Sequence, residues 1–260
     1  MDRTLDLIAW LVIIFLIGPL VVIIGGSFTE TPYVAFPPTG FTLDWYYQLA
    51  HRMDFLHSFL LSLTLAALCS LIAMLIGVSA ALGLHRYALK GSSLYKTFLM
   101  SPLVLPTVVT GVALLQFYYL IRLDTSLLGL LAAHVLITIP YVLRTVGAGL
   151  IGLDPAIEEA AASLGSGEIR TLLRVTLPAI APSIMAAVIF VFITSFDQTT
   201  VSIFLADVDL KPLPVLIFNY IDLAVDPMIA AVSTLLIIFA FGIIALLQRV
   251  LGLDKAMGVG

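Results

Sequence analysis

The sequence has little charge and almost no cysteine for its length. Only 11% of the 260 residues are charged and 61% are hydrophobic, whereas a soluble domain carries about 25% charged residues. A water-soluble fold of this size could not bury so much apolar surface, so a lipid bilayer must act as solvent for most of the chain. The single cysteine, Cys69, lies inside an apolar run. It excludes a disulfide framework or a cysteine metal cluster and fits a small buried side chain.

The motifs of common catalytic sites are also missing. The sequence contains no G-x-x-x-x-G-K-[ST] phosphate loop, no HExxH and no CxxC, so any ATP must be hydrolysed by a partner. The stretch Gly165-Ser166-Gly167 is not a G-x-S-x-G nucleophile elbow, and the acidic residues do not cluster as metal ligands do. We therefore expect no enzyme activity, metal or cofactor in this chain.

Six apolar stretches are long enough to cross a bilayer, which takes about 20 helical residues. They cover approximately residues 5–26, 58–84, 97–121, 127–150, 182–206 and 228–248. We predict an all-α membrane protein of six transmembrane helices, forming one transmembrane domain over residues 1–260. Prolines 102, 106 and 140 predict kinks within spans. The first stretch is too long for the apolar core of a cleaved signal peptide and is expected to stay as an anchor.

The basic residues predict the orientation of the spans, because cytoplasmic loops are enriched in Lys and Arg. With the N-terminus inside, the inner side holds Arg3, Arg86, Lys90, Lys96, Arg144, Arg170, Arg174, Arg249 and Lys255. The outer side then holds only Arg52, Arg122 and Lys211. Both termini are therefore predicted to be cytoplasmic. Two long segments, 27–57 and 207–227, are predicted outside, the second with a short apolar helix over Val215–Leu223.

The inner segment between the fourth and fifth spans, residues 153–178, predicts two short helices joined by a turn. Asp154 is a good N-cap and Pro155 suits the first helical position. Glu158 and Glu159 follow in the first turns, where the helix dipole favours negative charge, and Gly165 suits the position that ends such a helix. The first helix also presents a smooth face of small alanines, which another protein could approach closely.

The second helix of this segment is expected to be capped by Ser166 and stopped by Pro178. Residues 159–178 of this segment follow a spaced pattern: Glu159-Ala160-Ala161, three residues, Gly165, nine residues, Val175, one residue, then Leu177-Pro178. This spacing resembles the EAA loop of the membrane-spanning subunits of ABC importers, in which Ile replaces Val175. The resemblance implies the type I ABC importer permease (MetI-like) fold, in which this loop is the coupling helix that docks into an ATPase subunit.

The resemblance further implies the rest of the assembly. It would comprise a second permease subunit, two cytoplasmic ATPases that use ATP and Mg, and an extracytoplasmic solute-binding protein, with no nucleic acid, in a bacterial inner membrane. The residues expected to couple to the ATPase are Glu158, Glu159, Ala160, Ala161, Gly165, Leu177 and Pro178.

Polar residues inside membrane spans are costly and are candidates for function. Asp197 is placed in the outer half of the fifth span, and a continuous helix would put Thr194 and Thr200 on its face, with Phe190 and Phe204 on the same stripe. Such a set could attract a cationic solute by charge and cation–π contact. Alternatively, Asp197 pairs with a partner subunit or lies in water at the outer mouth. Weaker candidates are Gln116, His134, Ser195 and Gln198, with His134 expected to be a packing residue.

The stretch Ile193–Gln198, with Leu213-Pro214-Val215 and Ala230–Leu236, resembles the spermidine/putrescine branch of these permeases. That branch often has a second acid where this chain has Gln198, which weakens the case for a dication. Relatives that import other small amines, amino-phosphonates, opines or ferric ions share much of the pattern, so the solute stays open.

Three other classes of membrane protein remain as alternatives. An ion-coupled secondary transporter predicts paired interrupted helices and repeats; an intramembrane enzyme predicts a nucleophile with its base; a scaffold would need no spaced coupling loop. Copurification with a cytoplasmic ATPase would separate the permease from all three.

Overall fold

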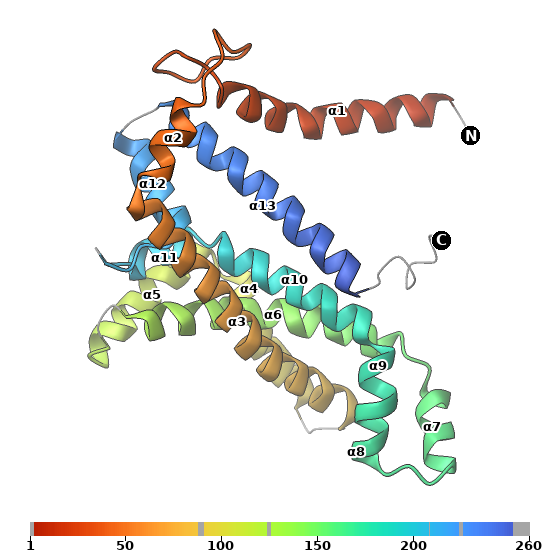
Figure 1. The fold of residues 1–260 in the computed structure, drawn as a ribbon. Coiled ribbons are helices and arrows are strands. Elements are labelled where there is room, and N and C mark those ends of the chain that lie inside the picture. The colour runs from red at the N-terminus through yellow and green to blue at the C-terminus, as the bar shows by residue number, and fades with distance from the viewer. Residues whose placement is uncertain (1–2, 88–90, 124–125, 208, 224–225, 252–260) are drawn as a thin grey trace. The chain divides into compact units, whose positions relative to one another are not determined.

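The computed structural model describes residues 3–87, 91–123, 126–207, 209–223 and 226–251. Within these ranges every regular element is a helix (Figure 1), so the all-α prediction is confirmed. The contacts divide the chain into two compact units, residues 3–57 with 216–251 and residues 58–215, and each unit is described by itself. Lys90 and Lys255, used above for orientation, lie outside the described residues.

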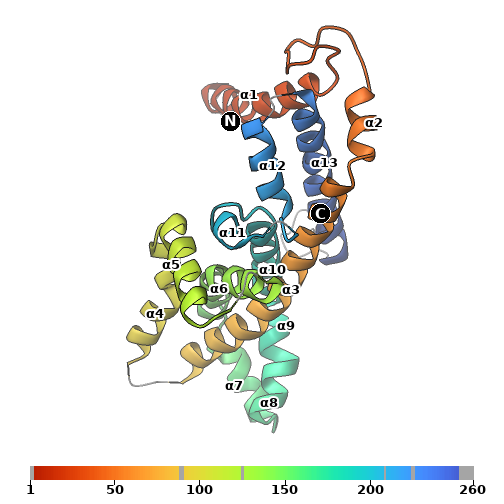
Figure 2. The same cartoon turned by 90° about the vertical axis from the view of Figure 1, so that its left-hand side faces the viewer.

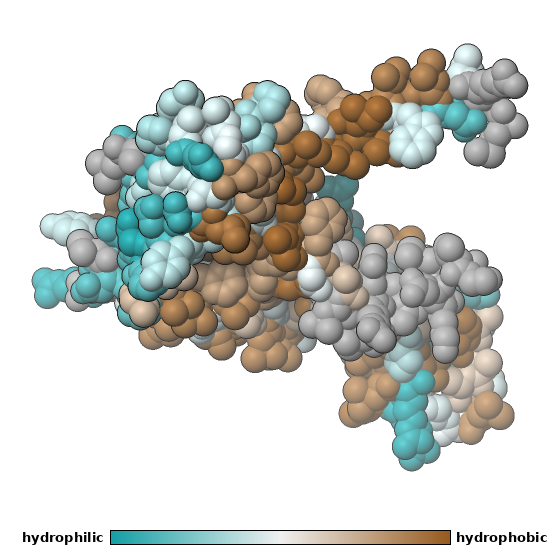
Figure 3. Space-filling model, turned by 45° about the horizontal axis from the view of Figure 1, so that its top comes forward, coloured by the Kyte–Doolittle hydropathy of each residue, from teal (hydrophilic) through white to brown (hydrophobic). Residues whose placement is uncertain are grey.

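The first unit contains α1 (Arg3–Gly26), α2 (Asp44–Ala50), most of α12 (Leu213–Leu223), and α13 (Pro227–Leu251). α1 matches the first expected span and is apolar enough to cross a membrane. It is exposed along most of its length and hydrophobic over most of that surface (Figure 3), and it contacts α13, which also contacts α2. α12 begins two residues before the predicted short helix, and α13 matches the sixth span.

The segment between α1 and α3 is ordered by its aromatic and hydroxyl side chains. The Trp45 indole N–H donates to the Thr29 carbonyl at 2.8 Å, and the hydroxyls of Ser27 and Tyr46 lie 2.6 Å apart. The Phe28 ring stacks at 5.7 Å on that of Phe41. The short helix α2 was not predicted, because its Asp-Trp-Tyr-Tyr start resembles an interfacial aromatic belt more than a helix.

The second unit is built around α6 (Leu127–Ile151), whose side chains are buried along much of the helix. α6 packs against α10 (Ala181–Phe196), and the two helices lie side by side in both views (Figures 1 and 2). The remainder of α3 (Met53–Arg86) approaches α6 so closely at Gly77 that a Cβ there would lie 2.6 Å from Val142. The absence of a side chain at Gly77 therefore lets the backbone of α3 lie directly against the Val142 side chain of α6.

Two of the expected spans are broken in the structure. The third consists of α4 (Ser92–Val104) and α5 (Thr107–Leu120), bent by 104° at Leu105–Pro106. Pro106 has no N–H to continue the helix, so the kink predicted there is confirmed. The fifth span, expected as one stretch, is α10 followed by α11 (Thr200–Leu205), with a break at residues 197–199.

Candidate functional site

The first of the two helices predicted for residues 153–178 is present as α7 (Pro155–Ser163). The Asp154 carboxylate accepts a hydrogen bond from the Ala156 N–H at 2.9 Å, and Pro155 occupies the first turn. Both features match the predicted start, since a side-chain acceptor satisfies an amide with no partner inside the helix.

The end of α7 is a Schellman turn closed by Gly165. The Ser166 N–H donates to Ala161 O and the Gly165 N–H to Ala162 O, at 3.1 and 2.9 Å. Gly165 has a φ of +83°, a conformation that disfavours side chains with a Cβ. The glycine of the EAA spacing is therefore favoured by the backbone geometry of this turn.

A second helical run follows the turn and leads into the fifth span. It consists of α8 (Glu168–Thr171), a π-helical turn η1 (Leu172–Thr176) and α9 (Leu177–Ala179). The run meets α10 at an angle of 68°. Pro178 removes one helical N–H close to this bend. It lies two residues after the π-turn, and π-turns occur frequently at functional sites. Leu177 and Pro178 therefore lie in α9, next to the bend that leads into α10.

Two details of this run differ from the sequence prediction. Ser166 does not cap α8; its N-cap is Gly167, which has no side chain, and the Ser166 hydroxyl accepts from the Thr171 hydroxyl at 3.0 Å. Pro178 does not end the second helix either, because the helical run continues to Ala179. The wider π-turn makes room for the proline, which a regular α-helix interior could not do without losing a bond.

The outward face of the coupling loop carries exposed apolar side chains. Ile157, Leu164 and Ile169 are 46%, 89% and 74% exposed. Glu159 and Ala160 are exposed beside them, while Ala161 is half-buried. Exposed apolar side chains gathered in this way are typical of an interaction surface.

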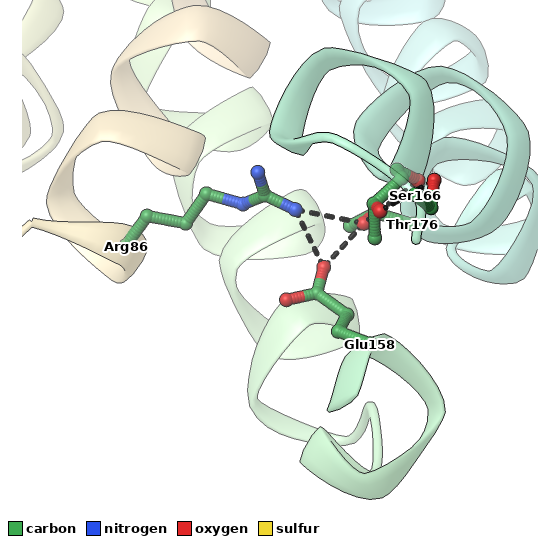
Figure 4. A network of polar contacts seen from close by, with 5 residues as sticks. Arg86, Glu158, Ser166 and Thr176 are labelled. Atoms are coloured by element: carbon green, nitrogen blue, oxygen red, sulfur yellow. Dashed lines mark hydrogen bonds and ion pairs between the residues drawn. The ribbon is translucent and has the colours of Figure 1, made fainter. Parts of the chain in front are cut away.

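Glu158 points the other way, into the protein (Figure 4). Its Oε1 accepts a hydrogen bond at 2.6 Å from Nη2 of Arg86, the last residue of α3. The same Arg86 nitrogen donates to the Thr176 hydroxyl at 2.8 Å, and that hydroxyl donates to Glu158 Oε1. We call these three residues the clamp. Neighbouring glutamates therefore have different surroundings, since Glu158 joins helices while Glu159 faces outward.

The clamp changes the acidity of Glu158. The hydrogen bond from Thr176 has the largest effect and lowers the pKa of this carboxyl below its ordinary value of 4.5. Desolvation opposes it, and the hydrogen bond and charge of Arg86 lower the pKa further. Both partners stabilise the charged form. Glu158 is therefore ionised at neutral pH, as the ion pair with Arg86 requires.

Another polar cluster of the second unit surrounds His134 on α6. Its Nδ1 lies 2.8 Å from the hydroxyl of Ser195 on α10, and its Nε2 lies 2.9 Å from that of Ser202 on α11. The imidazole is almost completely buried. It therefore links α6 to both sides of the break in the fifth span, which agrees with the packing role expected for His134.

The break itself contains the predicted substrate candidates. Asp197 terminates α10 and is exposed, and Gln198 places its Nε2 in a buried position where no acceptor is found among the described residues. Thr194 lies on α10 but Thr200 begins α11. The prediction that these threonines share one continuous helical face with Asp197 is therefore wrong, because the helix ends between them.

The other candidates are spread around this break. Phe190 on α10 is 55% exposed. Phe204 on α11 instead packs over Gly111 of α5, so the two rings do not form the predicted stripe. Gln116 lies exposed on α5.

Comparison with known proteins identifies the class. The family described as binding-protein-dependent transport system inner membrane component matches residues 73–252. The chain belongs to this family. It is therefore a permease subunit of an ABC importer, a multi-pass inner-membrane protein that works with other importer components such as an ATPase and a binding protein.

Curated relatives cover most of the chain. The putrescine transport system permease protein PotI of Escherichia coli is 31% identical over 90% of this chain and 88% of its own length. The spermidine/putrescine permease protein PotC of Haemophilus influenzae is 28% identical over 91% of each chain. The resemblance to the polyamine branch seen in the sequence is thereby confirmed at the level of the family.

Solved structures confirm the MetI-like fold. A bacterial ABC transporter that imports the acidic polysaccharide alginate has a chain with a TM-score of 0.72 and 13% identity, covering 96% of this chain and 98% of that one. The MetNI methionine transporter matches with a TM-score of 0.61 and 16% identity over 76% and 92% of the two chains. At these identities the likeness concerns the fold alone.

Within this permease, the sequence did not indicate that Arg86 and Thr176 contact Glu158. Arg86 was counted only as an inner-side cation, although its place at the end of a span near an acidic loop is a usable signal for an ion pair. Thr176, between Val175 and Leu177, had no such signal, because a lone threonine in an apolar run more often packs than binds.

Proposed function

We propose that this permease imports polyamines or a related small cationic solute, powered by two separate ATPase subunits that use ATP and Mg. A second permease subunit would complete the path, and an extracytoplasmic protein would deliver the solute. Both termini and the coupling loop would face the cytoplasm. The observation that carries the ATPase assignment is the outward face of the loop, with Leu164 standing 89% exposed beside Glu159.

The docking half of the proposal is tested at Leu164. An apolar anchor at the centre of an interface contributes about 2 kcal/mol or more, which corresponds to a loss of about 30-fold in affinity when it is removed. We expect Leu164→Glu to reduce copurification of the cognate ATPase by that order, while Leu164→Met retains it. Equal copurification of both variants with the wild type, at equal membrane insertion, would refute docking at this face.

The solute half rests on Asp197 at the break between α10 and α11. Interrupted spans place polar groups and unpaired backbone carbonyls at membrane depth, where transporters bind their solutes. An exposed carboxylate there would attract an ammonium group. The similarity to putrescine and spermidine permeases supports a polyamine, and the 29% identical 2-aminoethylphosphonate permease PhnV of Salmonella typhimurium makes that amine the comparison solute.

We expect Asp197→Asn to reduce uptake of radiolabelled putrescine into cells at least about tenfold, the effect of removing one partner of a charge pair worth about 1.4 kcal/mol. Asp209→Asn, which removes an exposed acid in the segment after α11, is the control and should transport normally. Normal putrescine uptake by Asp197→Asn would take this carboxylate out of the solute path. If excess 2-aminoethylphosphonate inhibited putrescine uptake and excess spermidine did not, the proposed solute would be an amino-phosphonate rather than a polyamine.

A further inference from the structure

The clamp joins three segments that are far apart in the sequence. Arg86 is 72 residues from Glu158 and 90 from Thr176. Arg86 ends α3, Glu158 lies in the first turn of α7, and Thr176 closes η1 just before the joint with α10. One guanidinium nitrogen, one carboxylate oxygen and one hydroxyl therefore meet where two spans and the docking helix converge.

The positions of the two charges favour their own helices as well as each other. A cation at the C-terminus of a helix and an anion in the first turn of another each interact favourably with the helix dipole. Arg86 and Glu158 occupy these positions, and their side chains are only 22% and 33% exposed. The pair is thus shielded from water more than an ordinary surface ion pair, so its geometry is better defined.

The hydroxyl of Thr176 bridges the two charged residues of the clamp. It accepts from Arg86 and donates to Glu158, which uses its single proton and one lone pair. Thr176 is fully buried, while its two charged partners are partly exposed. A displacement of Glu158 would therefore disturb both the end of α3 and the π-turn that leads into α10.

The peptide chain links α7 closely to α6 and α10 but not to α3, so the chain alone would pass movement of α7 only to the first two helices. A short link ties α7 to α6, and the run from α8 to α9 ties it to α10 across the 68° bend. α3 has no such direct link to α7, because residues 87–154 intervene. The contact between Arg86 and Glu158 supplies one.

We propose that Arg86, Glu158 and Thr176 are positioning residues that transmit displacement of the docking helix α7 to α3 and α10 together. The inference rests on the proposed ATPase docking and adds a division of labour between adjacent glutamates. Glu159 faces the docking partner, and Glu158 passes the resulting movement inward. Coupling of this kind requires a connected element whose arrangement differs between states.

The test uses the complete transporter reconstituted in proteoliposomes with its cognate ATPase and binding protein. Three permease variants are compared with the wild type: Arg86→Glu, Glu158→Arg, and the double exchange, in which the opposite charges again face each other. Each is assayed for ATPase copurification, for ATP hydrolysis and for putrescine uptake per ATP hydrolysed. Lys96→Met, which removes an exposed cation of α4, is the matched charge control.

We expect both single variants to copurify with the ATPase as the wild type does. Their uptake per ATP should fall at least fivefold, the lower end of measured coupling between sites, which spans about 5- to 150-fold. The double exchange should recover most of this loss, because Thr176 can still accept from the arginine and donate to the glutamate. Lys96→Met should keep the wild-type ratio.

Two results would overturn the clamp. Wild-type uptake per ATP in either single variant would show that movement passes elsewhere, and a double exchange no better than the single variants would show that the charges act separately. Failure of the proposed docking would look different, since the ATPase would then fail to copurify even with the wild-type permease. Thr176→Val checks the hydroxyl without changing charge and should lower the same ratio while insertion stays normal.

Discussion

Two polar clusters in residues 58–215 each join three helical segments through side-chain hydrogen bonds, but one is charged and the other is neutral. The clamp joins α3, α7 and η1 outside the spans through a charged pair and a hydroxyl. The cluster of His134, Ser195 and Ser202 joins α6, α10 and α11 within the membrane-embedded part by neutral hydrogen bonds. Burying charge in hydrocarbon is expensive, so the membrane cluster uses neutral groups, while the loop can use an ion pair.

The difference has a mechanical consequence. Breaking the His134 cluster would leave hydroxyls without partners in a low-dielectric interior, which opposes rearrangement. The clamp is partly exposed, so water can replace its bonds at a smaller cost. We infer that the membrane cluster holds the interrupted fifth span in one arrangement, while the clamp can form and release during transport.

The largest effect is expected from His134→Leu, which keeps a similar volume and removes both hydrogen bonds. Interhelical hydrogen bonds in membranes contribute about 0.6 kcal/mol on average and up to about 1.7 kcal/mol, so we expect a loss of about 2 kcal/mol. Unfolding of the purified permease in mixed micelles measures it. Ser202→Ala, which removes one of the two bonds, should lose less than half as much. Equal stability of His134→Leu and the wild type would show that the cluster holds nothing together.

Much of this comparison could be predicted from the sequence, but only where the signal was local. The start and end of α7 followed from Asp154, Pro155 and Gly165, because capping depends on neighbouring residues. The kink at Pro106 followed in the same way. These elements were correct because no distant contact was needed to specify them.

The contacts that define the site depend on residues distant in the sequence. The break after Asp197 carries no proline or glycine in the stretch Ser195–Thr200, so hydropathy indicated a continuous span. The break is stabilised by His134 on α6, which hydrogen-bonds to Ser195 before the break and to Ser202 after it. The pairing of Arg86 with Glu158 likewise depends on how α3 and α7 pack. Local patterns could not supply either partner.

A smaller effect is expected from Thr176→Val on the clamp side. The substitution keeps the shape of the buried side chain and removes the hydroxyl that bridges Arg86 and Glu158. A typical hydrogen bond contributes about 1 kcal/mol, and the direct ion pair remains, so we expect a loss of about that size. The same micelle unfolding measures it, and Thr176→Ser, which restores the hydroxyl, is the control. A loss as large as that of His134→Leu would contradict the distinction between the two clusters.

The smallest effect, and the one that depends on pH, is expected from Glu158→Gln. Because the Thr176 hydrogen bond and then Arg86 lower the pKa of Glu158 in the folded protein, folding favours the charged carboxylate. Its contribution is therefore complete above the ordinary value of 4.5 and is lost as the pH falls through the lower folded pKa.

We expect the wild type to exceed Glu158→Gln in stability by about 0.5 kcal/mol between pH 5 and 8, a value discounted for solvent screening. The gap should close as the pH falls below the ordinary value of 4.5 and through the lower folded pKa. It should also shrink in high salt, because the pair is partly exposed. Glu159→Gln provides the control, since that side chain is exposed and lies outside the clamp, and this variant should be as stable as the wild type. A gap that widens on acidification would mean that folding favours the protonated carboxyl, and the clamp as drawn in Figure 4 would then not hold Glu158 as an anion.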